Sequence, residues 1–151
     1  MSESNLTKLK RVKGYEFRAE FDVAGMPSLI VDETKPAGEN NGPNPPRLLS
    51  VAVGHCLSSS LLFCLNKARI DVKDFKTTIK TTPIRNDEGL LRIESMEVTV
   101  HVDVDEKDKT RASKCLEIFE NYCTVTQSVR KGIDVITHTR LVSSPVTEHQ
   151  P

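Results

Sequence analysis

The chain lacks an excess of charge of either sign, because 21 Lys and Arg balance 21 Asp and Glu over its 151 residues. A basic field that would attract phosphate backbones is therefore missing, and we do not expect nucleic acid as a partner. Trp is absent, and the aromatic residues are only two Tyr and five Phe, yet hydrophobic residues make up 37% of the sequence. This composition predicts one soluble globular domain with a modest core.

An apolar run behind basic residues, as in a secretory signal, is missing from residues 1–14. We expect residues 1–13 to form a polar tail, residues 14–142 to form the single domain, and residues 143–151 to form a second polar tail. The expected compartment is the cytoplasm. Because thiols are kept reduced there, structural disulfides are a poor explanation for the four cysteines.

The longest stretch without a formal charge runs from Leu48 to Leu65. Its length is near the lower limit for a membrane span, roughly 17 to 25 residues. Its small polar residues, however, are typical of a helix that packs against protein: Ser50, Gly54, His55, Ser58, Ser59 and Ser60. We therefore predict a buried helix rather than a membrane span, starting at Pro45 and Pro46 and ending near residues 67–69.

Alternating apolar and polar residues predict strands at 15–23, 75–82 and 96–104. A short strand at 29–31 forms a hairpin with the first of these, and residues 34–46 form a loop. A second helix, capped by Asp105 and Asp108, carries an apolar stripe of Ala112, Cys115, Leu116, Phe119 and Tyr122 or Cys123. A short third helix over 124–131 and a final strand over 133–141 complete an α+β domain with antiparallel strands.

Two cysteine pairs share one spacing: Cys56 and Cys64 are eight residues apart, as are Cys115 and Cys123. Eight helical residues span about 12 Å, which exceeds the roughly 7 Å between Cα atoms that a disulfide tolerates. Pairings between the two helices stay open, and antiparallel helices could bring Cys56 near Cys123 and Cys64 near Cys115. Alternatively, all four are small buried hydrophobic residues, which fits Cys64 and Cys115 well. No metal site is expected, because the chain has no C-x-x-C and no recognised ligand spacing.

Two segments carry a family resemblance. Residues 42–56 read GPNPPRLLSVAVGHC and match a pattern of G-x-x-P, Leu-Leu and a small-residue helix with a cysteine. Downstream, residues 123–126 read CTVT and look like a C-P-V-S segment. Together with the order of elements, these features resemble the OsmC/Ohr family of osmotically induced and organic-hydroperoxide-resistance proteins, over roughly Gly14 to Val142.

The resemblance implies an OsmC-like fold, in which antiparallel sheets pack on a long central helix, and an intertwined homodimer with an active site at each subunit interface. It also implies that Cys56 is a peroxidatic thiol and Cys123 a resolving one. They would reduce organic hydroperoxides at the expense of a dithiol such as dihydrolipoamide, through a sulfenic acid that condenses to a disulfide. No cofactor is expected.

The chain departs from the family at the groups that activate the thiol. The family's peroxidases use an arginine held by a glutamate, but Pro46 occupies the position of that glutamate, ten residues before Cys56. Candidate activating cations are Arg18 and Lys35, since Cys56 is too far from the helix start to feel its dipole. The alternative function is an OsmC-like protein without peroxidase activity that binds a small apolar or electrophilic ligand at the dimer interface. A purely structural dimer is a third possibility.

Overall fold

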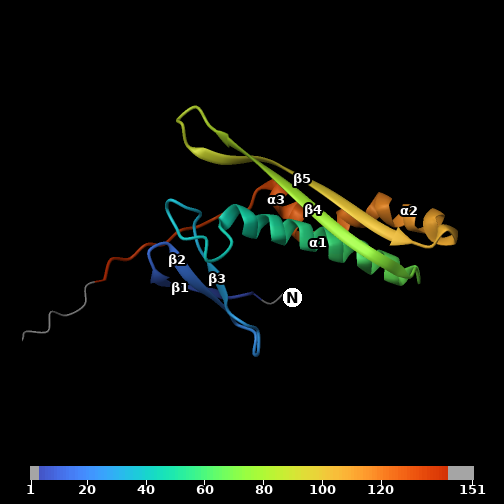
Figure 1. The fold of residues 1–151 in the computed structure, drawn as a ribbon, viewed down its shortest axis with the longest axis horizontal. Coiled ribbons are helices and arrows are strands. Elements are labelled where there is room, and N and C mark those ends of the chain that lie inside the picture. The colour runs from blue at the N-terminus through green and yellow to red at the C-terminus, as the bar shows by residue number, and fades with distance from the viewer. Residues whose placement is uncertain (1–3, 143–151) are drawn as a thin grey trace, which may run out of the picture.

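The N-terminal part of the chain forms a small antiparallel sheet. The structure is a computed structural model that describes residues 4–142. Strands β1 (Thr7–Lys13), β2 (Glu16–Phe21) and β3 (Leu29–Val31) lie in the order β1-β2-β3 (Figure 1). The prediction of a polar tail over residues 1–13 is wrong at β1, which pairs with β2 along its length. All residues of β1 are exposed, so this strand has no buried face to produce a clear sequence pattern.

Helix α1 (Pro45–Lys67) has the predicted bounds. The Asn44 side chain accepts a hydrogen bond from the backbone N–H of Arg47, and Pro45 and Pro46 occupy the first turn, where proline costs no hydrogen bond. One stripe of α1 is buried and consists of Val53, Gly54, Leu57, Leu61 and Leu65. The opposite side is open in the single chain, so burial of α1 is confirmed on one face only. By length and composition alone, α1 could also cross a membrane.

A long hairpin packs along α1 (Figure 1). Its strands β4 (Val72–Arg85) and β5 (Leu91–Val104) are antiparallel, and their inward residues Met96, Val98, Val100, Val102 and Val104 pack on the core. The small residues of α1 allow this approach: a Cβ on Gly54 would lie 2.4 Å from Cδ1 of Ile79. Ser58 Oγ lies 2.6 Å from Thr77 Oγ1 in a hydrogen bond. Small and polar residues of α1 therefore attach it to the hairpin.

The remaining elements cover another side of α1: η1 (Glu106–Asp108), α2 (Lys109–Ile118), η2 (Phe119–Tyr122) and α3 (Thr124–Lys131). Helix α3 has the predicted bounds. Asp105 and Asp108 stand at the N-cap positions of η1 and α2, but neither side chain makes a cap hydrogen bond; they form ion pairs with Lys73 and Arg111 instead. The apolar stripe is confirmed at Ala112, Cys115, Phe119 and Cys123, whereas Leu116 and Tyr122 are exposed.

The predicted strand over residues 133–141 does not form in the single chain. Strands need a hydrogen-bonded neighbour, and within residues 4–142 this segment pairs with no other strand. Its apolar residues, among them Ile133, Val135 and Ile136, are exposed. The predicted tail over 143–151 lies outside the described residues. The α+β class with antiparallel sheets and a long helix is confirmed.

Candidate functional site

The four cysteines meet along one helix interface. Cys56, Ser60 and Cys64 lie four residues apart on α1 and therefore share one stripe of the helix. This stripe faces the segment from Cys115 to Cys123 on the other side of the interface. Because the two segments run antiparallel, the equal spacing brings Cys64 to Cys115 and Cys56 to Cys123. This is the pairing, among those that the spacing had left open, that antiparallel helices allow.

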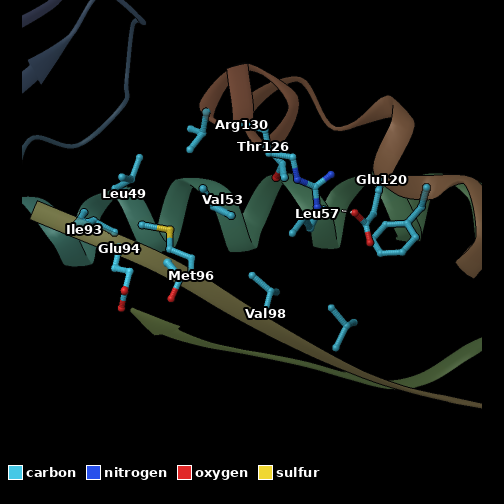
Figure 2. Close-up of a pocket in the computed structure, with 14 residues that line it drawn as sticks. Leu49, Val53, Leu57, Ile93, Glu94, Met96, Val98, Glu120, Thr126 and Arg130 are labelled. Atoms are coloured by element: carbon cyan, nitrogen blue, oxygen red, sulfur yellow. Dashed lines mark hydrogen bonds and ion pairs between the residues drawn. The ribbon is translucent and has the colours of Figure 1, made fainter. Parts of the chain in front are cut away.

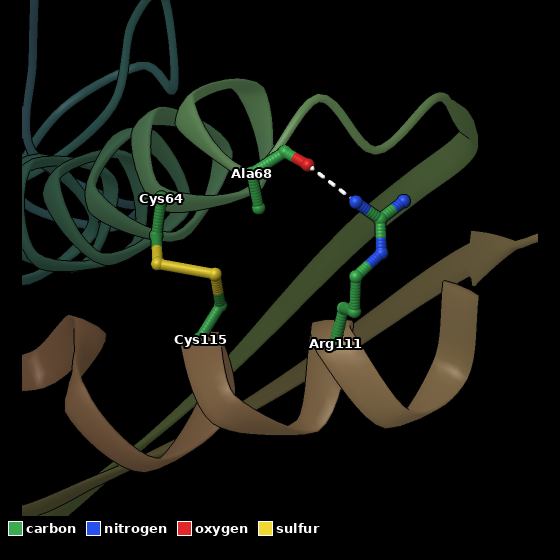
Figure 3. The surroundings of a disulfide bond; sticks show 4 residues. All are labelled: Cys64, Ala68, Arg111 and Cys115. Atoms are coloured by element: carbon green, nitrogen blue, oxygen red, sulfur yellow. Dashed lines mark hydrogen bonds between the residues drawn. A yellow bond between two sulfur atoms is a disulfide. The ribbon is translucent and has the colours of Figure 1, made fainter.

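Cys64 and Cys115 form a disulfide (Figure 3). Their Cα atoms are 5.7 Å apart, within the range that a disulfide requires. Close by, Arg111 Nη1 donates a hydrogen bond of 3.0 Å to the carbonyl of Ala68 at the end of α1. The interpretation of this cysteine pair as packing residues, and the argument against structural disulfides, are therefore wrong here. The spacing permits this bond but does not require it, so sequence alone could not decide.

Cys56 and Cys123 are both free thiols, and they lie close enough for each to shift the pKa of the other. Cys56 is half-buried, whereas Cys123 is fully buried at the residue before α3. The Sγ of Cys123 also lies 3.0 Å from Oγ1 of Thr126 in a hydrogen bond. The structure thus brings the two predicted catalytic cysteines together and gives them different surroundings.

The two thiols have pKa values shifted in opposite directions. Burial raises the pKa of Cys56, and the hydrogen bond to Cys123 raises it further, against the backbone amides of Val125 and Thr126. Burial also acts to raise the pKa of Cys123, but hydrogen bonds from Cys56, Thr126 and Ser60 outweigh it and lower this pKa overall. Cys123 is therefore the more acidic thiol of the pair.

Neither candidate cation lies at the cysteine pair within one chain. Arg18 is exposed on β2, opposite Lys10 on one side and Ile30 on the other. Lys35 is exposed in the loop before α1, where its Nζ is 3.8 Å from Oε2 of Glu39. Within residues 4–142, no cation is among the groups that shift the pKa of Cys56. An activating role for Arg18 or Lys35 thus stays a prediction.

The loop that carries Lys35 is tied together by one buried carboxylate. Asp32, only 4% exposed, accepts hydrogen bonds from the backbone N–H groups of Glu33, Glu39 and Asn41, at 2.8, 2.9 and 3.1 Å. These bonds, with that of Glu39 the strongest, lower the pKa of Asp32. The loop also needs Gly38, because a Cβ there would lie 2.1 Å from the carbonyl oxygen of Glu33. The chain entering α1 is therefore well ordered.

A cavity of about 540 Å³ lies between α1, β5 and α3 (Figure 2). Most of its wall is apolar: Leu49, Val53, Leu57, Ile93, Met96, Val98, Val100, Phe119 and Val129. Its polar part includes Glu120 and Arg130, which form an ion pair of 2.7 Å. Thr126 lines this cavity and is also hydrogen bonded to Cys123. Thr126 thus contacts both the cavity and the buried thiol.

Sequence reasoning missed Ser60 and Thr126 at this site. Their positions held a signal, since Ser60 follows Cys56 by four residues on a helix and Thr126 follows Cys123 by three. It missed the pair of Glu120 and Arg130 as well, which are ten residues apart on different elements. In residues 4–142, no group of three or more His, Cys, Asp or Glu is placed to hold a metal ion.

Comparison with known proteins identifies the family. A family model described as OsmC-like protein matches residues 38–138, and the chain therefore belongs to the OsmC family. No curated protein sequence matches the chain. The solved structures that resemble it share the fold at low sequence identity.

One of these structures is an OsmC-like protein of unknown function from Vibrio cholerae, with a TM-score of 0.70 and 16% identity over 85% of this chain and 94% of that one. An OsmC-like protein from Mycoplasma pneumoniae has a TM-score of 0.68 and 10% identity over 86% and 89% of the two chains. An organic hydroperoxide resistance protein from Elizabethkingia anophelis has a TM-score of 0.62 and 19% identity over 86% and 90%. The OsmC-like fold is thus confirmed.

Proposed function

We propose that the protein is a thiol-dependent peroxidase that reduces organic hydroperoxides through Cys56 and Cys123. The observation that carries this proposal is the proximity of two free thiols, one half-buried and one fully buried, each of which shifts the pKa of the other. Two neighbouring thiols can form a disulfide once one of them is oxidised. Family membership and the likeness to hydroperoxide resistance proteins support the same chemistry.

Cys56, the more accessible thiol, is the peroxidatic residue in this proposal. Its sulfur attacks the terminal oxygen of the hydroperoxide, the O–O bond breaks, and the alkoxide leaves as an alcohol after taking up a proton. Cys123 then attacks the sulfur of the Cys56 sulfenic acid, and water leaves as the disulfide forms. A dithiol such as dihydrolipoamide restores both thiols by two exchange steps. The proposed compartment is the cytoplasm.

The experiment is turnover of cumene hydroperoxide with dihydrolipoamide as the reductant. We expect Cys56→Ser to abolish consumption and Cys123→Ser to stop turnover after one equivalent. The matched control is the double variant Cys64→Ser/Cys115→Ser, which removes two cysteines outside the reacting pair and is expected to keep activity at 25 °C. Wild-type protein that consumes no hydroperoxide, under conditions where both thiols are reduced, would refute the proposal.

A homodimer is part of the proposal. Val51 and Phe63 lie on the open face of α1 and are 63% and 62% exposed. Residues 133–142 add further exposed apolar side chains that include Ile133, Val135 and Ile136. Apolar surface of this extent on a small chain favours association with a second copy. In such a dimer Arg18 or Lys35 of one subunit could reach the thiols of the other.

The cavity supports a second candidate function, the binding of a small apolar ligand without turnover. Its volume and apolar wall suit a small organic molecule. The test is binding of an anilinonaphthalene sulfonate dye in Val98→Phe, which narrows the cavity, with Thr99→Phe on the opposite face of β5 as the control. Weakened binding only in Val98→Phe would favour this function. Equal binding in the two variants would argue against it.

A further inference from the structure

Cys123 has to lose its thiol proton when it forms a bond to the Cys56 sulfur, but solvent does not reach it. Its exposed fraction is 0%, and it stands at the residue before the first turn of α3. A buried donor that has no contact with water can release its proton only through a group to which it is hydrogen bonded. The exit of this proton therefore depends on the side chains around the sulfur.

The Thr126 hydroxyl connects this sulfur to the cavity between α1, β5 and α3. The Cys123 S–H donates a hydrogen bond to Thr126 Oγ1 over a distance of 3.0 Å. The contact has a local cause, because Thr126 follows Cys123 by three residues and so lies on the same side of the first turn of α3. Thr126 is also one of the residues that line the cavity (Figure 2). The same side chain thus contacts the reacting sulfur and the cavity.

A threonine hydroxyl can pass a proton on without a change in its own charge, because it accepts on its oxygen and donates its own hydrogen. The one hydrogen bond that the Thr126 hydroxyl makes within residues 4–142 is the bond from Cys123, so its O–H can donate to water in the cavity. The cavity reaches solvent, since the side chains of Arg130 and Glu120 in its wall are 55% and 49% exposed. A path from the buried sulfur to solvent therefore needs one protein hydroxyl.

We propose that Thr126 is the proton relay through which Cys123 releases its proton to the cavity during disulfide formation. This inference rests on the proposed function and adds a residue to its resolving step. The competing route is direct transfer of the Cys123 proton to the oxygen that leaves the Cys56 sulfenic acid. The two routes differ in one respect, because only the relay requires the Thr126 hydroxyl.

The resolving step balances as follows. An electron pair of the Cys123 sulfur forms the bond to the Cys56 sulfur, and the electron pair of the S–O bond leaves with the oxygen. The Cys123 proton passes to Thr126 Oγ1 while the Thr126 hydroxyl proton passes to a water molecule in the cavity. The departing hydroxide takes a proton from solvent. One thiol and one sulfenic acid thus give one disulfide and one water, and Thr126 is again a hydroxyl.

The experiment isolates the Cys123 step with the aromatic disulfide reagent dithiobisnitrobenzoate. The protein is the full-length, reduced chain with Cys64→Ser/Cys115→Ser, in which only Cys56 and Cys123 can react. The reagent forms a mixed disulfide with the more accessible Cys56 and releases one coloured nitrothiobenzoate. Cys123 then attacks the Cys56 sulfur and releases a second one. This leaving group departs as a thiolate and does not take up the Cys123 proton, so the second phase of colour depends on the exit of that proton.

Thr126→Val removes the hydroxyl at similar volume, and we expect it to slow the second phase and to leave the first unchanged. A positioned proton-transfer group contributes roughly 100-fold or more to a rate, and water from the cavity can replace part of this, so we expect a fall of about 10-fold. Thr126→Ser restores the hydroxyl and should restore the rate. Thr124→Val, the same substitution at an exposed residue of α3, is the matched control and should behave as the parent. A second phase of equal rate in Thr126→Val and the parent would overturn the relay.

The pH dependence separates a relay from a loss of packing. With the relay the second phase needs no hydroxide, so its rate should change little between about pH 6 and pH 8. In Thr126→Val the buried thiol has to be ionised by hydroxide first, and the rate should rise by up to about 10-fold per pH unit. A variant that only displaces Cys123 is slower at every pH but keeps the profile of the parent. The same profile in both proteins would therefore contradict the relay.

The outcome is separable from the fate of the proposed function, because dithiobisnitrobenzoate is not a peroxide. A second phase that is slow only in Thr126→Val, together with a wild type that consumes no hydroperoxide, would support the relay in disulfide formation and refute the peroxidase. A parent without a second phase would show that Cys123 does not attack Cys56 and would refute the relay. With cumene hydroperoxide, Thr126→Val should accumulate more dimedone-trapped sulfenic acid on Cys56 than the wild type, and equal amounts would contradict the relay.

Discussion

The disulfide between Cys64 and Cys115 and the free thiol pair of Cys56 and Cys123 lie at two levels of the same interface, eight residues apart on both segments. The first pair is covalently bonded and the second is free. The bonded pair fastens α2 to the last turns of α1.

The disulfide should stabilise the fold measurably. It joins residues 51 apart in the sequence, and a loop of this size corresponds to about 2 to 4 kcal/mol of stability. We expect Cys64→Ser to lower the free energy of unfolding by this amount in urea. Dithiothreitol should lower it by a similar amount in the protein that keeps the disulfide. Both should be measured with Cys56→Ser/Cys123→Ser as the background, so that only one bond can be reduced. If dithiothreitol does not change the stability of the Cys56→Ser/Cys123→Ser protein, the disulfide does not form in solution.

Asp32 should make stability depend on pH in the acid range. Its pKa is lowered in the folded state by hydrogen bonds from Glu39, Asn41 and Glu33, so the folded state binds fewer protons than the unfolded state. The resulting stabilisation is present at neutral pH and is lost as the pH falls below about 4. We expect Asp32→Asn to be less stable than the wild type at pH 7, with a difference that shrinks at pH 3, by urea unfolding.

The control for this prediction is Asp87→Asn, an exposed carboxyl in the turn between β4 and β5. We expect its stability to follow that of the wild type at both pH values. If Asp32→Asn also follows the wild type, the carboxylate does not hold the loop. If Asp32→Asn loses the same free energy of unfolding at pH 3 and at pH 7, the shape of the side chain rather than its charge matters at this position.

The sequence predicted the elements that have a strong local pattern. Helix α1 and helix α3 have the predicted bounds, because a proline start and a glycine end are local signals. The β4–β5 hairpin was predicted as well, since one face of each strand is half-buried and the other is exposed. Strand β1 was missed because none of its residues is buried, so pairing with β2 left no pattern.

Contacts between distant residues could not be predicted in the same way. The cysteine spacing limited the pairings, but which pair is bonded depends on the approach of α1 and α2 in three dimensions. The polar neighbours of Cys123 come from two helices, so Ser60 and Thr126 are found at the thiol only when the fold brings the helices together. The missing strand over 133–141 shows the converse case. Its alternation is clear in the sequence, but a strand also needs a neighbour, and the described chain supplies none.

Gly54 should be required for the packing of α1 on the hairpin. A Cβ at this position would lie 2.4 Å from Cδ1 and 2.9 Å from Cγ1 of Ile79. Alanine gains about 1 kcal/mol in helix propensity, but overpacking costs about 1 to 3 kcal/mol. We therefore expect Gly54→Ala to lower the free energy of unfolding by about 1 kcal/mol. The measurement is urea unfolding at 25 °C.

A double-mutant cycle provides the control for Gly54. Ile79→Val removes Cδ1, the nearer of the two contacting atoms. We expect Gly54→Ala to cost less in the Ile79→Val background, with a coupling energy of at least about 0.5 kcal/mol. Additive losses would mean that the two residues do not compete for space.

The open face of α1 should be the contact between two copies of the chain. Phe63 lies on this face with the Lys67 ammonium 5.0 Å from its ring centroid, and Val51 is also exposed nearer the start of α1. We expect light scattering to give twice the 16.8 kDa chain mass for the wild type, and the mass of one chain for Val51→Glu, because a carboxylate is costly to bury. Leu116→Glu, on α2 at 52% exposure, is the matched control and should stay dimeric. A wild-type protein with the mass of one chain would refute the homodimer. If Val51→Glu is still a dimer, the contact lies elsewhere, for example on residues 133–142.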